Sequence, residues 1–221
     1  MLVPEALCPA ASHRSAVNVA LRPVPVWKRC MDIVGAGSAL VLLAPLLLAI
    51  AAYIRVVSGR PVFFRQPRLG GGTRPFTIWK FRTLATNRPV EQHRQYVRSL
   101  MADEQAAAKP DLQRDLIPGG AFLRRYSLDE LPQLFNVLRG DMSLVGPRPD
   151  VLELEQYEPW QLRRFEVTPG ITGLWQVSGK NRLPFRRMIE LDIEYAERRN
   201  IWLDILILIK TLRAVVSSDN Q

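Results

Sequence analysis

The chain has 221 residues, of which 48% are hydrophobic, so it is long and apolar enough to bury a core and is not generally disordered. Its 30 Lys and Arg outnumber 21 Asp and Glu, which gives a net charge of +9, and 25 of these cations are Arg. Guanidinium groups bind phosphates through two hydrogen bonds at once, so nucleic acid, anionic lipid or a nucleotide-linked substrate is an expected partner. The alternative is that the preference for Arg over Lys reflects genome composition alone. Two Cys and two His exclude a disulfide framework and a zinc cluster, so a metal would be held mainly by oxygens.

Residues 1–26 contain four prolines and no sustained period, and they predict a mobile N-terminal extension.

An uncharged stretch of 22 residues, 33–54, is long enough to cross a bilayer. Pro45 lies in its middle and removes a backbone hydrogen bond, which predicts a kink. Cations flank both ends, Lys28 and Arg29 before it and Arg55 and Arg60 after it, whereas a spanning helix has a cation excess on one side. A re-entrant hairpin and a kinked spanning helix are both compatible with these features.

Residues 61–82 contain two apolar, β-branched clusters around a Gly-rich turn at 68–72, which predicts two short strands. On the second strand, Lys80 and Arg82 alternate with aromatic residues, so both side chains lie on one face of the strand. This face is either exposed to solvent or binds phosphate. Backbone amides of the turn that begins at Arg68 could cradle a phosphate.

Further helices are predicted over residues 90–108, 127–139, 152–165, 184–198 and 201–216, with Gly140 ending the second of them. A short strand is predicted over 171–177, after a Pro-Gly turn. The last helix is very apolar but carries Asp204 and Lys210, so it is expected in the core or at a membrane interface.

The adjacent acids Asp129 and Glu130 lie near arginines, and such a group can provide a nucleophile and Mg²⁺ ligands. Taken alone, residues 127–130 favour a simpler interpretation, a capping box with Ser127 at the N-cap and Glu130 reaching back. Pro132 weakens that register, because a helix that starts later places it in the first turn and leaves both acids available to a ligand. Asp192, one helical turn before Tyr195, is more typical of a surface or salt-bridge residue.

In this order, the motifs resemble the bacterial sugar transferases, the monotopic phosphoglycosyl transferases, and most closely the short members of exopolysaccharide synthesis. The resemblance covers residues 27–216. The matching motifs are Lys28-Arg29 with Asp32, the apolar segment with Pro45, residues 66–70 (QPRLG), 80–83 (KFRT), 127–134 (SLDELPQL), 140–143 (GDMS), 146–149 (GPRP), 169–173 (PGITG) and 192–195 (DIEY).

The resemblance implies transfer of a sugar 1-phosphate from a UDP-sugar to undecaprenyl phosphate, with release of UMP. It implies that Asp129 is the nucleophile of a covalent phosphosugar intermediate and that Glu130, with Asp129, holds Mg²⁺. It favours the re-entrant hairpin broken at Pro45, in the bacterial inner membrane with the catalytic part on the cytoplasmic face. Other positions that it associates with the active site are Lys80, Arg124, Arg148, Pro149 and Asp192. Arg68 and Arg82, which lie in the matching motifs, are further candidates for substrate and phosphate binding.

The expected fold is mixed α/β and mainly helical. It comprises the extension (1–26), a re-entrant membrane helix (27–58) and a cytoplasmic domain (59–221) with interfacial amphipathic helices and short strands. Expected partners are the UDP-sugar, undecaprenyl phosphate and inner-membrane lipids, and a homo-oligomer is compatible with the sequence. Two other functions are alternatives. One is a non-catalytic membrane scaffold for glycan-assembly enzymes. The other is a basic nucleic-acid binder, which the apolar segment and the lack of a recognisable nucleic-acid module oppose.

Overall fold

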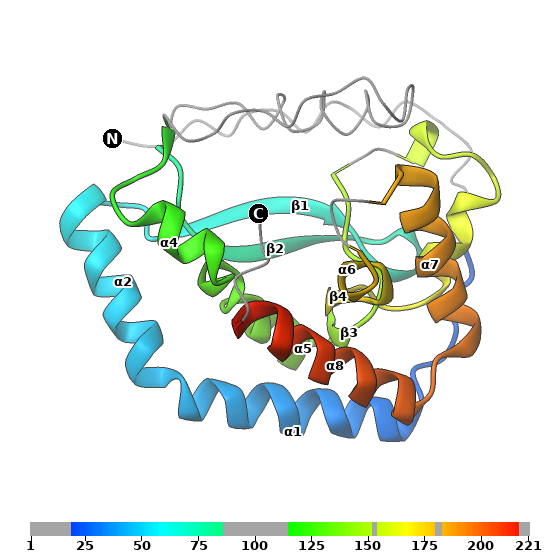
Figure 1. Cartoon of the computed structure of the whole chain (residues 1–221). Helices are drawn as coiled ribbons and strands as arrows, with labels where there is room; N and C mark the ends of the chain where they lie inside the picture. The colour runs from blue at the N-terminus through cyan, green and yellow to red at the C-terminus, as the bar shows by residue number, and fades with distance from the viewer. Residues whose placement is uncertain (1–18, 86–114, 152–153, 180–182, 217–221) are drawn as a thin grey trace.

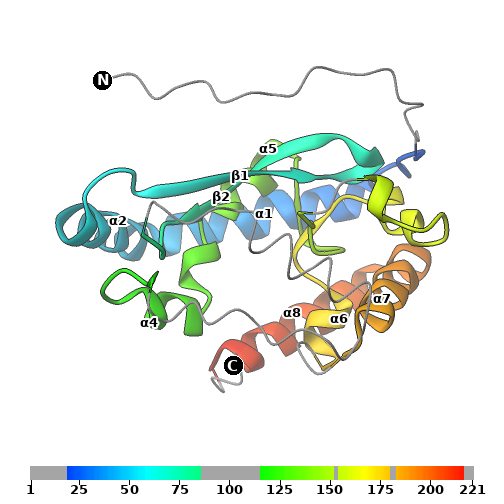
Figure 2. The same cartoon turned by 90° about the horizontal axis from the view of Figure 1, so that it is seen from above.

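The computed structural model describes residues 19–85, 115–151, 154–179 and 183–216 (Figure 1). The architecture is mixed α/β and mostly helical, as the sequence predicts, with two small two-stranded sheets. Seen from above, the β1–β2 hairpin and α1 run along one side of the molecule, and α6, α7 and α8 lie on the other (Figure 2). The helix predicted over 90–108 lies outside the described residues.

The apolar segment forms two helices, α1 (Val26–Leu42) and α2 (Ala44–Ser58), bent by 62° at Leu43. The predicted bend is therefore present, and Pro45 occupies the first turn of α2, where a missing N–H costs no helical hydrogen bond. No single described helix has the length and hydropathy of a membrane span, whereas the bent pair together does.

Polar side chains at the start of α1 tie it to the rest of the fold. Lys28 is buried, and its Nζ donates to Asp204 Oδ2 of α8 at 2.6 Å and to the Val145 carbonyl at 2.9 Å. Arg29 donates to two carbonyls at the end of α5, at 2.7 Å each. The carboxylate of Asp204 in the mostly apolar α8 thus has two buried partners, Lys28 of α1 and Tyr195, whose hydroxyl donates to Asp204 Oδ1 at 2.8 Å.

The two predicted strands are confirmed as an antiparallel hairpin, β1 (Phe63–Leu69) and β2 (Pro75–Phe81), with Phe63 opposite Phe81 and Leu69 opposite Pro75. The turn contains a 3-10 segment, η1 (Gly71–Thr73). Gly72 has a φ of 63°, a conformation that its missing side chain allows.

The helix predicted over 127–139 is divided. After α4 (Gly120–Arg125), a 3-10 turn η3 (Leu128–Glu130) precedes α5 (Gln133–Arg139). The predicted stop at Gly140 is confirmed, since this residue has a φ of 92° directly after α5. The capping box is wrong: Ser127 has a left-handed backbone with φ of 54° and makes no side-chain cap. The later register of Pro132 is the one that forms.

Two further predictions need correction. The helix over 152–165 is wrong: the described part holds two 3-10 turns, η4 (Leu154–Gln156) and η5 (Gln161–Glu166), and Pro159 between them cannot donate to a helical ladder. The strand over 171–177 is shorter, β4 (Gly170–Thr172), which pairs in parallel with β3 (Ser143–Val145) and is followed by α6 (Leu174–Val177). The last two helices are confirmed as α7 (Phe185–Arg198) and α8 (Ile201–Val216).

The described end of the segment predicted as an extension over 1–26 contacts the rest of the fold. The Arg22 N–H donates to the Glu166 carbonyl at 2.7 Å, and the Arg22 guanidinium donates to the Ala196 carbonyl at 3.1 Å. Arg199 donates to the Pro23 carbonyl at 2.7 Å. These contacts fasten the segment before α1 to η5 and to the end of α7.

Candidate functional site

The candidate site lies where β2, η3 and the loop after β3 meet, and Glu130 is at its centre. Glu130 Oε1 accepts from Lys80 Nζ of β2 and from Arg148 Nη2 of the loop, at 2.7 Å in both cases. A second Arg148 nitrogen, Nη1, lies 3.4 Å from Glu130 Oε2. Burial alone favours the neutral acid, but Arg148 and Lys80 outweigh it, and the pKa of Glu130 lies well below its usual value.

Asp129, the neighbouring acid, has different surroundings. It is 8% exposed, and within the described residues its carboxylate forms no ion pair. Burial raises the pKa of Asp129 to about 6, with the charge of Glu130 adding to the rise and Lys80 opposing it. Two adjacent carboxylates therefore differ in character: Glu130 is firmly ionised, and Asp129 titrates close to neutrality.

The backbone of η3 brings these acids together. Ser127 adopts a left-handed conformation after the end of α4, and the chain then turns through η3 before α5 begins. Strain of this kind in a non-glycine residue is typical of functional sites. The Glu130 side chain, which a capping box would direct back to the backbone, reaches Lys80 and Arg148 instead.

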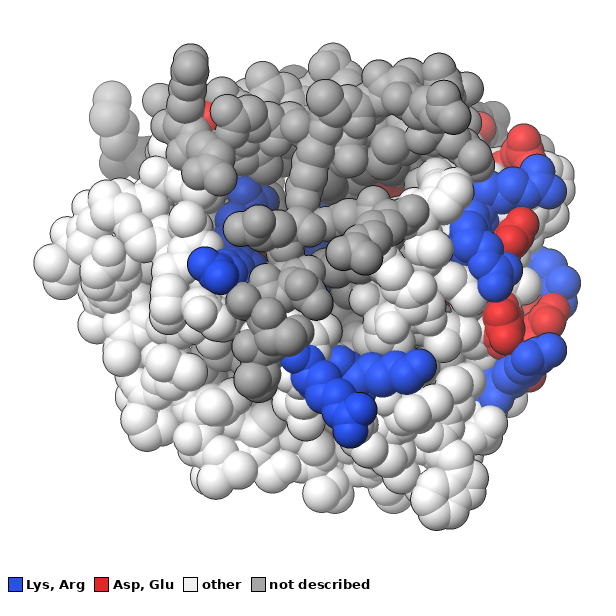
Figure 3. Space-filling model, in the orientation of Figure 1, with Lys and Arg blue, Asp and Glu red and all other residues white. Residues whose placement is uncertain are grey.

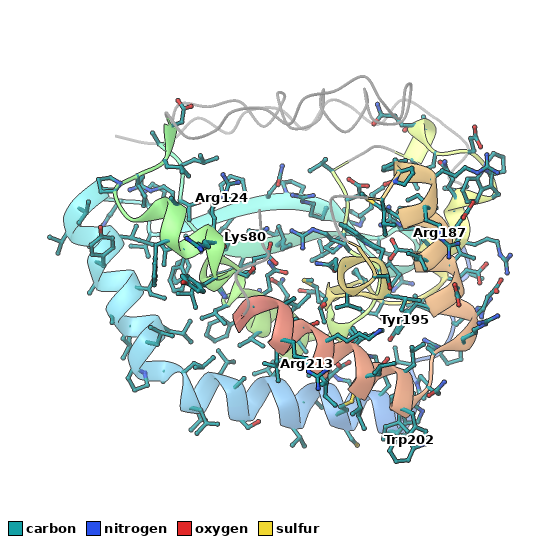
Figure 4. The ribbon with its side chains drawn as sticks, viewed as in Figure 1. Lys80, Arg124, Arg187, Tyr195, Trp202 and Arg213 are labelled. Carbon is teal, nitrogen blue, oxygen red and sulfur yellow. The ribbon has the colours of Figure 1, made fainter. Side chains whose placement is uncertain are left out.

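Lys80 is surrounded by the other charges of the site. Burial lowers the pKa of Lys80, and Glu130 opposes this shift. Figure 4 shows Lys80 of β2 and Arg124 of α4 near each other on the same side of the molecule. Both cations act on the Asp129 carboxylate and favour its ionised form. Arg124 is exposed, so it is available to an incoming ligand.

The loop that carries Arg148 is held by close backbone contacts between residues 145–149 and β4. The Gly146 N–H donates to the Thr172 carbonyl at 2.9 Å, and the Gly170 N–H donates to the Pro147 carbonyl at 2.9 Å. A β-carbon on Gly170 would lie 2.1 Å from Gly146 N, a separation that side chains essentially never show. Glycines in the GPRP and PGITG motifs therefore allow two backbones to touch next to the site.

Two of the predicted phosphate-binding positions support this loop from behind. Arg68 Nη1 donates to the Pro149 carbonyl at 3.2 Å, and Arg68 Nη2 donates to Gln66 Oε1 at 2.7 Å. Burial lowers the pKa of Arg68 to about 10, while Asp150 opposes the shift. Pro149 itself is buried, and its carbonyl is the group that Arg68 holds.

Two other predicted positions lie away from the acids. The Arg82 guanidinium donates to the carbonyls of Ser58, Gly59 and Arg60 at the end of α2, so it caps that helix. Asp192 of α7 is 0% exposed and accepts from Arg164 Nη2 at 2.7 Å. Arg164 was not predicted, and the sequence offers no feature that separates it from its neighbour Arg163, which is exposed.

The carboxylates of the site could provide some, but not all, of the oxygen ligands of a magnesium ion. Asp129 and Glu130 provide carboxylate oxygens, and Mg²⁺ usually takes one or two carboxylates and completes its shell with substrate phosphates and water. In the described parts of the chain, no group of three or more His, Cys, Asp or Glu converges to form a complete protein cage. The residues therefore fit an ion that arrives with a phosphorylated ligand.

The chain is similar to known proteins over most of its length. Residues 24–218 match the family model described as "Bacterial sugar transferase". The chain is 38% identical over 203 residues to the exopolysaccharide production protein ExoY of Rhizobium meliloti, covering 90% of both chains. It is 37% identical over 220 residues to the undecaprenyl-phosphate glucose phosphotransferase of Komagataeibacter xylinus, covering 90% of this chain and 38% of that protein.

The name of a third relative contains both a sugar donor and a lipid acceptor. The chain is 39% identical over 207 residues to the UDP-N-acetylgalactosamine-undecaprenyl-phosphate N-acetylgalactosaminephosphotransferase of Aeromonas hydrophila, covering 89% of this chain and 46% of that protein. The chain thus spans nearly the whole of ExoY but less than half of the other two relatives. The matched residues include β2, η3 and the GPRP loop. The chain therefore belongs to the bacterial sugar transferase family.

Proposed function

We propose that the chain transfers a sugar 1-phosphate from a UDP-sugar to undecaprenyl phosphate, through a covalent intermediate on Asp129. The observation that carries this proposal is that two adjacent acids differ. Glu130 is ionised and bound by Lys80 and Arg148, whereas Asp129 has no ion-pair partner among the described residues. Relatives named as UDP-sugar and undecaprenyl-phosphate phosphotransferases support the same substrate classes.

In the first step, an oxygen of the Asp129 carboxylate attacks the phosphorus that bears the sugar. The bond from this phosphorus to the bridging oxygen breaks, and UMP leaves with the electron pair. In the second step, a phosphate oxygen of the lipid attacks the same phosphorus, the bond to Asp129 breaks, and the free carboxylate is restored. Covalent catalysis of this kind lets two substrates use one site in turn.

The cations of the site would stabilise the phosphoryl group during both steps. Lys80 and Arg148 are already held together at 2.7 Å from one Glu130 oxygen, so a diphosphate placed beside that oxygen meets two fixed positive charges. Arg124 adds a third, exposed charge near Asp129. Glu130 and Asp129 would hold Mg²⁺, which supplies further neutralisation of phosphate charge when it is bound.

Membrane attachment is part of the proposal. Large apolar side chains are exposed along α1, α2 and α8, and Val34, Leu42, Leu48, Val56 and Trp202 are each at least 69% exposed. In Figure 3 the edges of the molecule over α1 and most of α2 are uncharged, whereas charges of both signs gather over α7 at the opposite edge. We assign the bent pair α1–α2 to the cytoplasmic leaflet of the inner membrane, with α8 at its surface, because apolar area of this extent favours a lipid environment.

The test is release of UMP by the protein in nanodiscs with Mg²⁺, measured over a panel of UDP-sugars with and without undecaprenyl phosphate. We expect turnover with one or a few donors to require the lipid, and Asp129→Asn to abolish it without changing nanodisc incorporation. Glu190→Gln, which removes an exposed carboxylate of α7, is the matched control and should retain full activity. Substantial turnover by Asp129→Asn would refute the nucleophile, and a folded wild type that is inactive with every donor would favour the scaffold function.

A further inference from the structure

Arg164 of η5 is a buried arginine that connects the GPRP loop to α7. Its side chain is 4% exposed. One nitrogen, Nη2, donates to the Arg148 carbonyl at 2.8 Å and to Asp192 Oδ2 at 2.7 Å. The other, Nη1, lies 3.3 Å from Asp150 Oδ2 and 3.4 Å from the Tyr157 hydroxyl. The Arg164 guanidinium therefore binds two carboxylates and also the backbone of Arg148, the residue whose side chain contacts Glu130.

The loop needs such support because of its own sequence. Pro147 and Pro149 have no N–H groups, so the loop cannot be fixed by amide donors at these positions. Its carbonyls are used instead: the consecutive carbonyls of residues 148 and 149 accept from the guanidiniums of buried Arg164 and half-buried Arg68. These two arginines come from different elements and hold the loop at the point where the Arg148 side chain leaves it.

Asp192 supplies the charge that Arg164 requires. Burial opposes the charged form of Arg164, but Asp192, Tyr157 and Asp150 outweigh it, and the pKa of Arg164 is raised. A buried cation without a carboxylate partner is strongly unfavourable, so Asp192, together with Asp150, stabilises this guanidinium in place. Because Asp192 is 0% exposed and faces Arg164, its link to the site runs through Arg164.

We infer that Arg164 is a positioning residue, which fixes Arg148 against Glu130 by holding the Arg148 carbonyl, and that Asp192 acts on the site only through Arg164. The inference rests on the proposed transferase function for its kinetic consequence. A displacement of about 1 Å in a catalytic group can lower the rate by about 100-fold, so loss of this anchor should be visible in turnover.

The experiment combines Arg164→Lys with Arg148→Ala in a double-mutant cycle. Lysine keeps the charge beside Asp192 but cannot fork between the carbonyl and the carboxylates. Arg163→Lys is the matched control, because the adjacent Arg163 is 49% exposed and pairs with Glu197 at the surface. UMP release gives kcat and KM for each variant in nanodiscs, and amide hydrogen exchange of peptides that cover 145–151 reports the loop directly.

We expect Arg164→Lys to lower kcat/KM by about 10- to 100-fold in the wild-type background and to have no further effect in the Arg148→Ala background. We also expect faster exchange at 145–151 in Arg164→Lys and not in Arg163→Lys. A general structural defect would instead multiply the two losses, and that result would overturn the action through Arg148. Unchanged exchange would overturn the positioning itself. Because the exchange measurement does not need turnover, a wild type without transferase activity but with the expected exchange difference would refute the proposed function alone.

Discussion

Gly170→Ala is the most direct test of how the fold constructs the site. The added methyl would lie 2.1 Å from Gly146 N, 2.6 Å from the Thr172 carbonyl oxygen and 2.7 Å from Gly146 Cα. All three are backbone atoms, so no side chain can rotate away. Gly170 does not have a left-handed backbone, so glycine is required here because a side chain has no room, and not because of the backbone conformation.

The magnitude follows from these contacts. Ordinary van der Waals separation begins near 3.4 Å, so Gly146 must move by at least about 1.3 Å. Overpacking of this kind costs about 1–3 kcal/mol, and a strained or lost buried hydrogen bond between β3 and β4 adds about 1–3 kcal/mol. At about 2–4 °C per kcal/mol for a chain of this size, the thermal midpoint should fall by at least about 4 °C.

The same shift would reach the site, because Gly146 lies two residues before Arg148. A movement of about 1 Å separates Arg148 Nη2 from Glu130 beyond the present 2.7 Å, and we expect UMP release to fall by about 100-fold. Gly37→Ala is the control: this glycine lies in α1 with no other atom within 4 Å of an added methyl, and alanine there should add up to about 1 kcal/mol of helix stability. A Gly170→Ala protein with the thermal midpoint and activity of Gly37→Ala would refute the close-contact reasoning.

Three further outcomes follow from the charges. If Asp129 is the proposed nucleophile, the rate of the first UMP burst, measured without lipid acceptor, should fall about tenfold per pH unit below about 6, because protonation of the buried carboxylate removes its nucleophilic form. Glu130→Gln should move this midpoint to lower pH, because the Glu130 charge helps to raise the Asp129 pKa. Lys28→Met should lower the free energy of unfolding by about 3–5 kcal/mol, measured by thermal or denaturant unfolding in detergent, because it leaves buried carboxylates without their cation. Arg82→Leu should cost about 2–4 kcal/mol in the same measurement, because it leaves carbonyls at the end of α2 without donors, whereas exposed Arg55→Leu should change stability by less than about 0.5 kcal/mol.

The elements were predictable where a local pattern decides them. A charge-free apolar run with an internal proline gives a bent helix pair, and two β-branched clusters around glycines give the β1–β2 hairpin. The helix predicted over 152–165 is wrong because Pro159 interrupts the helical composition and because Tyr157 and Phe165 pack into a core cluster with α7. Such packing depends on distant parts of the chain, which no local period records.

The acids at residues 129–130 show the limit of local reasoning. Their sequence satisfies a capping box, and only the position of Pro132 argues for the later helix start that the structure contains. What turns Glu130 away from its own backbone is the pair Lys80 and Arg148, which lie 50 and 18 residues away in the chain. The alternation that predicts Lys80 and Arg82 on one strand face likewise does not reveal that Lys80 binds Glu130 whereas Arg82 binds carbonyls at the end of α2.

The bent pair of helices has a geometrical consequence. At 1.5 Å per residue, α1 and α2 are about 26 and 23 Å long, and a bend of 62° places their junction about 12 Å from the line that joins their outer ends. A hydrocarbon core is about 30 Å thick, so a pair with both ends at one surface reaches a little short of the bilayer midplane. In the membrane attachment proposed above, a pair of this shape would displace lipid from one leaflet only, on the side where the proposed reaction brings a lipid phosphate to Asp129.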